Sequence, residues 1–169
     1  MTVRKIITHP HPVLQQKAEP VACFDDALKE LAADMAETMY SAPGVGLAAN
    51  QIGVARRLVV IDIKPEDRAG LVVLVNPKIA ASEGCQVGEE GCLSVVDYFD
   101  KVERFQRIRV EAQDLDGTPV TFAAEDFFAR VLQHELDHLD GVLFIDHLSR
   151  LKKTLYKKKL QKMLADRDE

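Results

Sequence analysis

Gln133-His134-Glu135-Leu136-Asp137-His138-Leu139-Asp140-Gly141 is the stretch from which the organisation of this 169-residue chain can be worked out. On an α-helix, residues four positions apart share a face, so the imidazoles of His134 and His138 can reach one point. Two imidazoles can bind a transition metal ion, and a neighbouring carboxylate, here Glu135, can act as general base toward water. A helix with two solvated or capped histidines would show the same pattern. The motif therefore needs support from the rest of the chain.

The helix that carries this motif has recognisable boundaries. Asp126 is a suitable N-cap and Gly141 a suitable stop. Four side chains fall along one stripe of this helix: Phe127, Val131, His134 and His138. The face that binds the metal is therefore predicted to be the buried face.

The flanking sequence predicts a further set of helices and strands. A helix is expected from Asp25 or Asp26 to about Ser41, with apolar positions at Leu28, Leu31, Met35 and Met39. Strands are expected at 57–63, 71–75 (interrupted by Asn76-Pro77 and resuming through 79), 87–94, 104–114 and 118–124, the last two forming a hairpin through 115–117. A final helix near Ser149 has apolar positions at Leu151, Leu155, Leu160 and Leu164. The fold class is predicted as α+β: mixed, mainly antiparallel β-sheets packed around the central motif helix, with a C-terminal helix.

Composition narrows the class of protein. Hydrophobic residues make up 47% of the chain and charged residues 29%, as in an ordinary globular domain. No apolar run approaches the roughly 18–20 residues of a membrane span, and the first ten residues lack the apolar segment of a signal peptide. Three cysteines without a C-x-x-C pair argue against a disulfide framework. We therefore expect a cytoplasmic protein that does not bind a membrane.

Charge is unevenly distributed. From Leu148 to Glu169 there are eight basic residues against three acidic ones, whereas the whole chain has a net charge of −5. The body is therefore acidic and the C-terminal segment basic, which suggests an anionic partner for that segment. We expect residues 1–148 to form a catalytic unit and residues 149–169 a basic helical extension of the same domain.

A hydrolytic metal site has three protein ligands and one open position, so a third ligand must come from outside the helix. The downstream candidates, none with local support, are Asp140, Asp146 and His147. Upstream, Cys92 stands in Glu89-Glu90-Gly91-Cys92-Leu93-Ser94, at the end of a predicted strand. As a thiolate Cys92 would complete a Cys-His-His set. The ordinary alternative for a lone cysteine is a buried structural residue.

A glycine-containing segment, Gly44-Val45-Gly46-Leu47-Ala48-Ala49-Asn50-Gln51-Ile52-Gly53, permits close approach of another backbone. The segment has neither G-x-G-x-x-G nor a Walker lysine, so a phosphate loop is not indicated. The side-chain amide of Gln51 could donate to a developing oxyanion, although this residue alone does not establish such a role.

Together, three motifs resemble those of the bacterial peptide deformylases. They are Gly44–Gln51, Glu90-Gly91-Cys92-Leu93-Ser94 and Gln133–His138, in the order and with the spacing of that family. The resemblance extends from the proline-rich start to Asp146-His147-Leu148. It implies a hydrolase that removes the N-formyl group from the formylmethionine of nascent polypeptides and releases formate.

The resemblance also implies roles for individual residues. One divalent ion would be held by Cys92, His134 and His138, naturally Fe²⁺, with Zn²⁺, Ni²⁺ or Co²⁺ tolerated. Glu135 would be the general base, and the Gln51 side chain and Leu93 backbone NH the oxyanion donors. The backbones that would line the peptide groove belong to Val45, Gly46 and Gly91. The pair that would orient the cysteine loop is Glu90 with Arg104.

The basic C-terminal helix is consistent with this resemblance, which implies a role for it: in many bacterial deformylases a C-terminal helical extension docks on the ribosome near the exit tunnel. Contact with rRNA phosphates would be electrostatic and would not read nucleic-acid sequence. A solvated amphipathic helix packed on the body is the alternative. The chain departs from the family at Val96, where a proline is common, and at Phe99, where some members have an arginine that contacts substrate.

Three other functions fit parts of the sequence. A generic H-E-x-x-H metallopeptidase would cleave internal peptide bonds and would take a third ligand from downstream, so Cys92 argues against it. A structural metal site would need a fourth protein ligand and would leave Glu135 without a role. A catalytically silent deformylase homologue would retain the ligands but lack activity.

Overall fold

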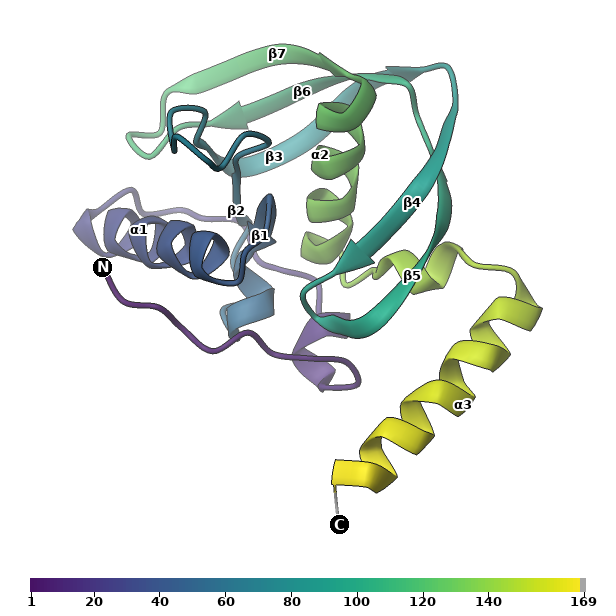
Figure 1. The fold of residues 1–169 in the computed structure, drawn as a ribbon. Helices are drawn as coiled ribbons and strands as arrows, with labels where there is room; N and C mark the ends of the chain where they lie inside the picture. Colours follow the sequence, from purple (N-terminus) through teal and green to yellow (C-terminus); the bar gives the residue numbers. More distant parts are fainter. Residues whose placement is uncertain (168–169) are drawn as a thin grey trace.

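The computed structural model describes residues 1–167, and Figure 1 shows the arrangement of their elements. The helices are α1 (Asp26–Ser41), α2 (Asp126–Leu139) and α3 (Arg150–Arg167), with short 3₁₀ turns at Pro12–Gln15, Ala49–Ile52 and Phe144–His147. The strands are β1 (Gly46–Ala48), β2 (Leu58–Ile61), β3 (Val72–Glu83), β4 (Gln86–Cys92), β5 (Val95–Arg104), β6 (Arg107–Gln113) and β7 (Pro119–Glu125).

The strands form two separate antiparallel sheets. Five strands pair in the order β1-β2-β3-β6-β7, whereas β4 and β5 pair only with each other as a hairpin. Helix α2 lies between the five-stranded sheet and this hairpin (Figure 1). The predicted α+β class, with mainly antiparallel sheets around a central motif helix, is confirmed.

Apolar burial fixes α2 in its central place. Leu132, Leu136 and Leu139 pack with Ile108 and Val110 of β6 in one core cluster. A second core cluster joins α1 to β1 and β2, and a third joins the hairpin to the turn before α3. A fully buried leucine contributes about 1.5–3 kcal/mol relative to exposure. The helix that carries the two histidines is therefore held by its apolar face to the rigid sheet.

Strand β5 was not predicted. Arg104, which was predicted to begin the following strand, is the last residue of β5. The prediction placed 104–114 in one strand, but β6 begins at Arg107. Charged residues interrupt Val95–Arg104, so the sequence does not read as an apolar run. The hairpin pairing with β4 creates the strand, with Gln86 opposite Arg104 and Gly91 opposite Phe99.

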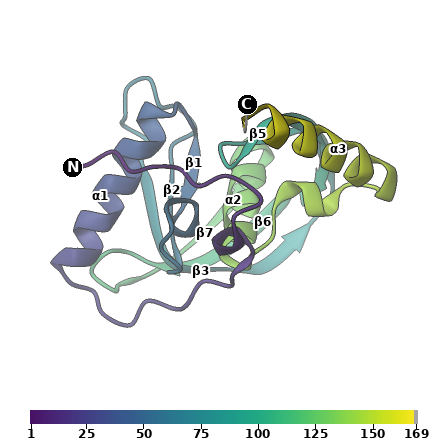
Figure 2. The same cartoon turned by 90° about the horizontal axis from the view of Figure 1, so that it is seen from below.

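The predicted burial of apolar side chains is also partly wrong on two helices, α2 and α3. Phe127, predicted on the buried stripe of α2, is 52% exposed. On α3, Leu151 and Leu155 are mostly exposed, whereas Tyr156 is buried. The reason is that α3 lies against the body along a narrow line beside β5 (Figure 2), where the Tyr156 ring meets Tyr98 edge-on at 5.0 Å.

Gly141 holds the end of α2 against the N-terminal segment. Its φ is +75°, and a Cβ there would lie 2.5 Å from the carbonyl oxygen of Gln15. Gly117, in the β6–β7 turn, has a similar φ of +84°, but a Cβ there would find ordinary contacts at 3.4 Å. The two glycines thus share a backbone conformation and differ in the space around them.

We predict that Gly141→Ala destabilises the protein more than Gly117→Ala. A left-handed alanine alone costs about 1–2 kcal/mol, which is our expectation for Gly117→Ala. The Gly141 variant must in addition displace the Gln15 backbone. Urea unfolding of both variants measures the difference, and equal free energies of unfolding would contradict the prediction.

Candidate metal centre

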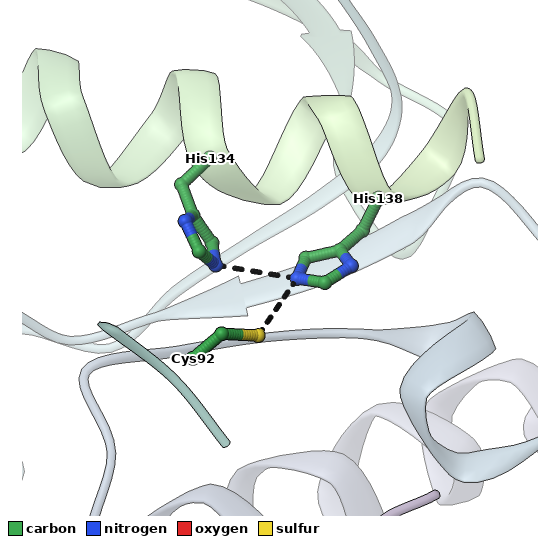
Figure 3. A group of neighbouring side chains, drawn as sticks. All are labelled: Cys92, His134 and His138. Atoms are coloured by element: carbon green, nitrogen blue, oxygen red, sulfur yellow. Dashed lines mark hydrogen bonds between the residues drawn. The ribbon is translucent and has the colours of Figure 1, made fainter. Parts of the chain in front are cut away.

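Three ligand atoms meet at one point between α2 and the hairpin (Figure 3). His138 Nε2 lies 3.2 Å from His134 Nε2 and 3.3 Å from Cys92 Sγ, and all three atoms lie within 4.8 Å of one another. Both histidines are buried. The structure therefore brings together the three residues expected to bind the metal.

The spacing of these atoms fits a tetrahedral ion. Bond lengths of roughly 2.0–2.1 Å to nitrogen and 2.3 Å to sulfur place tetrahedral ligand atoms about 3.3 Å apart for N and N and about 3.6 Å for N and S. The distances between His138 and its two partners are close to these values. Three ligands of this kind leave a fourth position for water or substrate.

The secondary structure explains why these side chains converge. His134 and His138 lie one turn apart on α2, so their rings project from the same face. Cys92 is the last residue of β4 and pairs with Val95, so Leu93 and Ser94 form a two-residue hairpin turn. The Ser94 backbone NH donates to Cys92 Sγ at 3.4 Å. This turn fixes the thiol opposite the helix.

Glu90 orients the first imidazole. Its carboxylate accepts from His134 Nδ1 at 2.9 Å, which leaves Nε2 of that ring facing the cluster. Arg104 donates to both Glu90 oxygens at 2.9 Å, and Arg130 donates through Nη1 at 2.6 Å. Burial alone would raise the pKa of Glu90, but the hydrogen bonds from Arg104 and His134 hold it well below its usual value. Glu90 is therefore ionised.

The pKa values of the two imidazoles are shifted in opposite directions. Burial lowers the pKa of His138 well below its ordinary value, and the nearby His134 lowers it further. Burial acts the same way on His134, but the hydrogen bonds of Cys92 and Glu90 outweigh it and raise its pKa well above the ordinary value. The two rings therefore lie in different electrostatic surroundings, because Cys92 and Glu90 act on His134 while burial dominates at His138.

Glu135 lies against the glycine segment. A Cβ at Gly46 would lie 2.7 Å from Glu135 Oε1, so only glycine lets the carboxylate approach β1 this closely. Glu135 Oε2 is buried and has no hydrogen-bond partner within residues 1–167. Burial raises the pKa of this carboxyl to about 7. A carboxyl with a pKa near neutrality can both accept and return a proton.

Gln51 presents its amide nitrogen to the cluster. The Ala48 backbone NH donates to Gln51 Oε1 at 2.9 Å, which fixes the orientation of the amide. Gln51 Nε2 donates to Ser94 Oγ at 3.1 Å and lies 3.7 Å from Cys92 Sγ. A preorganised NH donor therefore stands beside the open side of the cluster.

A cavity of about 400 Å³ opens onto this cluster. Glu135, His134 and Cys92 line its inner end, and the exposed rings of Phe99 and Phe127 lie at its edge. The residues expected to bind substrate or oxyanion also line it: Val45, Gly46, Gln51, Gly91 and Leu93.

The downstream residues considered as ligands have other partners. Asp140 pairs with Arg57, and Asp146 accepts from the Leu143 backbone NH. His147 Nε2 lies 2.8 Å from Asp137 Oδ2, which also accepts from Arg104 at 2.6 Å. None of the three joins the cluster formed within the described chain.

Sequence reasoning missed two polar residues at the site. Ser94, two residues after Cys92, accepts from Gln51, and Arg130 donates to Glu90. The sequence could have pointed to Arg130, because it lies one helical turn before His134 and so on the same face of the helix. Ser94 had no comparable signal, because its partner lies 43 residues away.

Comparison with known proteins gives a consistent result. A sequence model of the polypeptide deformylase family matches residues 3–154. A peptide deformylase of Desulfotalea psychrophila is 48% identical over 169 residues, covering 99% of this chain and all of the relative. A crystal structure of a peptide deformylase from Legionella pneumophila has a TM-score of 0.92 and 45% identity, covering 99% of this chain and 98% of that one.

We predict that Cys92→Ala removes most of the metal-binding capacity and that Cys85→Ala, at the exposed turn between β3 and β4, does not. Loss of the thiolate leaves two imidazoles, too few for a stable site of this type. Metal content per chain after reconstitution and desalting measures the effect. Equal metal content in both variants would place the ion elsewhere.

Proposed function

The chain belongs to the polypeptide deformylase family, and we propose that it deformylates nascent polypeptides. In this proposal the ion is held by Cys92, His134 and His138. The groups that act beside the ion belong to Glu135, Gln51 and Leu93. The family is metal-dependent and hydrolyses the N-formyl group of nascent polypeptides. The observation that carries the assignment of residues is the meeting of one thiol and two imidazole nitrogens within 4.8 Å, in the cavity that Glu135 lines.

The ion we propose is Fe²⁺, with Zn²⁺, Ni²⁺ and Co²⁺ also accepted. Imidazole and thiolate ligands suit these ions better than they suit Mg²⁺ or Ca²⁺. A divalent ion in this ligand set supplies Lewis-acid chemistry, since it lowers the pKa of water and polarises a carbonyl group. The thiolate ligand also leaves ferrous iron open to oxidation, so purification without oxygen is required.

Glu135 handles the protons of the reaction. Its carboxylate accepts a proton from water as the water oxygen bonds to the formyl carbon, and returns it to the amine as the C–N bond breaks. The products are formate and a free N-terminal amine. The raised pKa of Glu135, about 7, suits it to both transfers near neutral pH.

Gln51 and Leu93 stabilise the charge that develops on the formyl oxygen. Gln51 Nε2 is fixed by Ala48 and Ser94, and the Leu93 NH belongs to the turn that follows Cys92. Donors that are already in place need no reorganisation when the charge forms. These two NH groups therefore serve as the oxyanion hole.

The peptide groove follows from the edge of the sheet. β1 pairs with β2 on one side only, so its other edge can accept an added strand. Val45 and Gly46 line the cavity on this edge, and Gly91 lines the opposite wall on β4. We assign these backbones to binding of an extended formylmethionyl peptide, with Glu90 and Arg104 positioning His134 behind them.

The alternatives fit less well. A metallopeptidase of the ordinary type takes its third ligand from downstream, where Asp140, Asp146 and His147 are engaged elsewhere. A structural ion would need a fourth ligand, and the cluster within residues 1–167 has three members. A silent homologue is separated from an active enzyme by assay alone.

We predict formate release from formyl-Met-Ala-Ser by the anaerobically reconstituted Fe²⁺ protein. Glu135→Gln should lower kcat by about 10²–10⁴-fold, because it removes the proton acceptor without changing its shape. Gln51→Ala should lower kcat by about 10²–10³-fold through loss of one oxyanion donor. Glu111→Gln, whose carboxylate pairs with Lys78 at the surface, is the control. No formate release by the wild-type protein would refute the function.

We further propose that residues 149–169 form a basic extension that docks on the ribosome near the exit tunnel, beside the catalytic unit of residues 1–148. Residues 168 and 169 of this extension lie outside the described residues. Lys152 and Lys159 of α3 turn toward the body, where they contact Asp100 and the Asp97 carbonyl. Lys162 is exposed too, and so are three lysines nearer the start of the helix: Lys153, Lys157 and Lys158. Because its substrate arises at the ribosome, we place the protein in the cytoplasm; no described helix is long and apolar enough to cross a membrane.

Replacing these three exposed lysines with alanine should weaken ribosome co-sedimentation and lower its salt dependence by up to about three in the log–log slope. The buried Tyr156 stays in place, so the packing of α3 is kept. The control replaces three exposed lysines of the body: Lys5, Lys17 and Lys101. Equal loss of binding in both triple variants would favour a helix that merely packs on the body.

A further inference from the structure

The position of Cys92 relative to the two histidines depends on how the β4–β5 hairpin is attached to α2. The hairpin forms a separate two-stranded sheet, so no strand ladder ties it to the five-stranded sheet that supports α2. The hairpin is attached instead by an apolar cluster shared with the turn before α3 and by hydrogen bonds between side chains of the hairpin and α2. Glu90, on the hairpin, and His134, on the helix, form one such contact at 2.9 Å.

Arg130 spans the gap at this point. From its place on α2, Nη1 donates to the Val102 carbonyl at 2.9 Å and to the Gly88 carbonyl at 3.3 Å. Gly88 and Val102 are directly opposite each other in the hairpin. The same nitrogen donates to Glu90 at 2.6 Å. One guanidinium group thus binds both strands of the hairpin and the carboxylate that orients His134.

Gly88 gives Arg130 the room to do this. A Cβ at Gly88 would lie 3.2 Å from Arg130 Nη2 and 3.3 Å from both Cζ and Nε, so the guanidinium lies flat against the glycine. Arg130 Nη2 is buried without a hydrogen-bond partner among the described residues. A buried NH without a partner is costly. The guanidinium therefore does not maximise its own hydrogen bonds; it lies where Nη1 reaches all three oxygens.

We propose that Arg130, seated on Gly88, is a positioning residue that sets the distance between Cys92 and the histidines and thereby the affinity of the metal site. It acts through Glu90 and the hairpin backbone and does not touch the ion. Arg104 cannot replace it, because Arg104 belongs to the hairpin itself and reaches α2 only through Asp137, at the far end of the helix. This inference rests on the proposed assignment of Cys92, His134 and His138 as ligands.

The test measures Co²⁺ affinity by chelator competition and the absorption bands of the Co²⁺-loaded protein. Arg130→Met keeps the length of the side chain and removes its donors. Loss of a group that orients a ligand typically costs about 10–100-fold in metal affinity, and we expect a loss in this range with altered bands. Arg107→Met, which breaks only exposed ion pairs with Glu83 and Glu125, should change neither. Affinity within twofold of wild type for Arg130→Met would overturn the proposal.

Gly88→Ala tests the same geometry without removing the charge, and keeps the proposal testable if Arg130→Met fails to fold. The added methyl group would stand 3.2–3.3 Å from the guanidinium, tighter than an ordinary contact, and would shift it relative to its three acceptors, so we expect weaker Co²⁺ binding in this variant. In an Arg130→Met background the methyl group has nothing to displace, and the double variant should bind as Arg130→Met does. Unchanged affinity of Gly88→Ala, or independent costs that multiply in the double variant, would overturn the proposal.

Cys92→Ala separates this inference from the proposed site. If Cys92→Ala binds Co²⁺ as tightly as wild type, the assignment of the ligands fails and the inference falls with it. If Cys92→Ala loses the ion while Arg130→Met and Gly88→Ala keep it, the metal site stands and only the role of Arg130 is refuted.

Discussion

The carboxylate of Glu90 is the point on which the geometry of the centre depends. Two arginines and His134 donate to its two oxygens, and the groups involved come from both the hairpin and α2. Two guanidinium groups and a carboxylate are expensive to bury, and removal of one partner of such a pair typically costs about 3–5 kcal/mol. An apolar cluster of the same volume could give comparable stability, but it could not orient an imidazole. The buried charges therefore orient the His134 imidazole and also join the hairpin to α2.

The sequence predicts the motif helix α2 better than it predicts the β4–β5 hairpin. The motif helix was predictable because its histidine spacing and Gly141 are local signals. The predicted N-cap was wrong, because Asp126 is the first residue of the helix and Glu125 occupies the N-cap position without a side-chain hydrogen bond. Strand β5 was not, since its charged residues hide the alternation and only pairing with β4 makes it a strand. The links between Arg130 and Glu90 and between Gln51 and Ser94 join residues about 40 positions apart, and no local pattern encodes them. The exposed Phe127 shows the same limit, because it faces a cavity that exists only after folding.

The resemblance to deformylases supplied what local patterns could not. Local sequence made Cys92 a candidate ligand with a buried structural cysteine as the alternative, and the resemblance favoured the ligand. The structure brings this thiol and the two histidines together while Cys23 and Cys85 are exposed. Val96 lines a small cavity together with residues of α3, and Phe99 lies over Gly91 and lines the cavity that opens onto the cluster. Both concern the surroundings of the chemistry and leave the reacting groups unchanged.

The separation of the β4–β5 hairpin from the main sheet has a consequence for local unfolding. In hydrogen-exchange terms, the amides of β4 and β5 belong to a unit that can open without disrupting the five-stranded ladder. Each opening would withdraw Cys92 from the histidines and so remove one of the three proposed ligands of the ion. An ion bound to the closed form in turn makes opening rarer by mass action. The amides of the hairpin are therefore expected to exchange more slowly when an ion occupies the proposed site than when the site is empty.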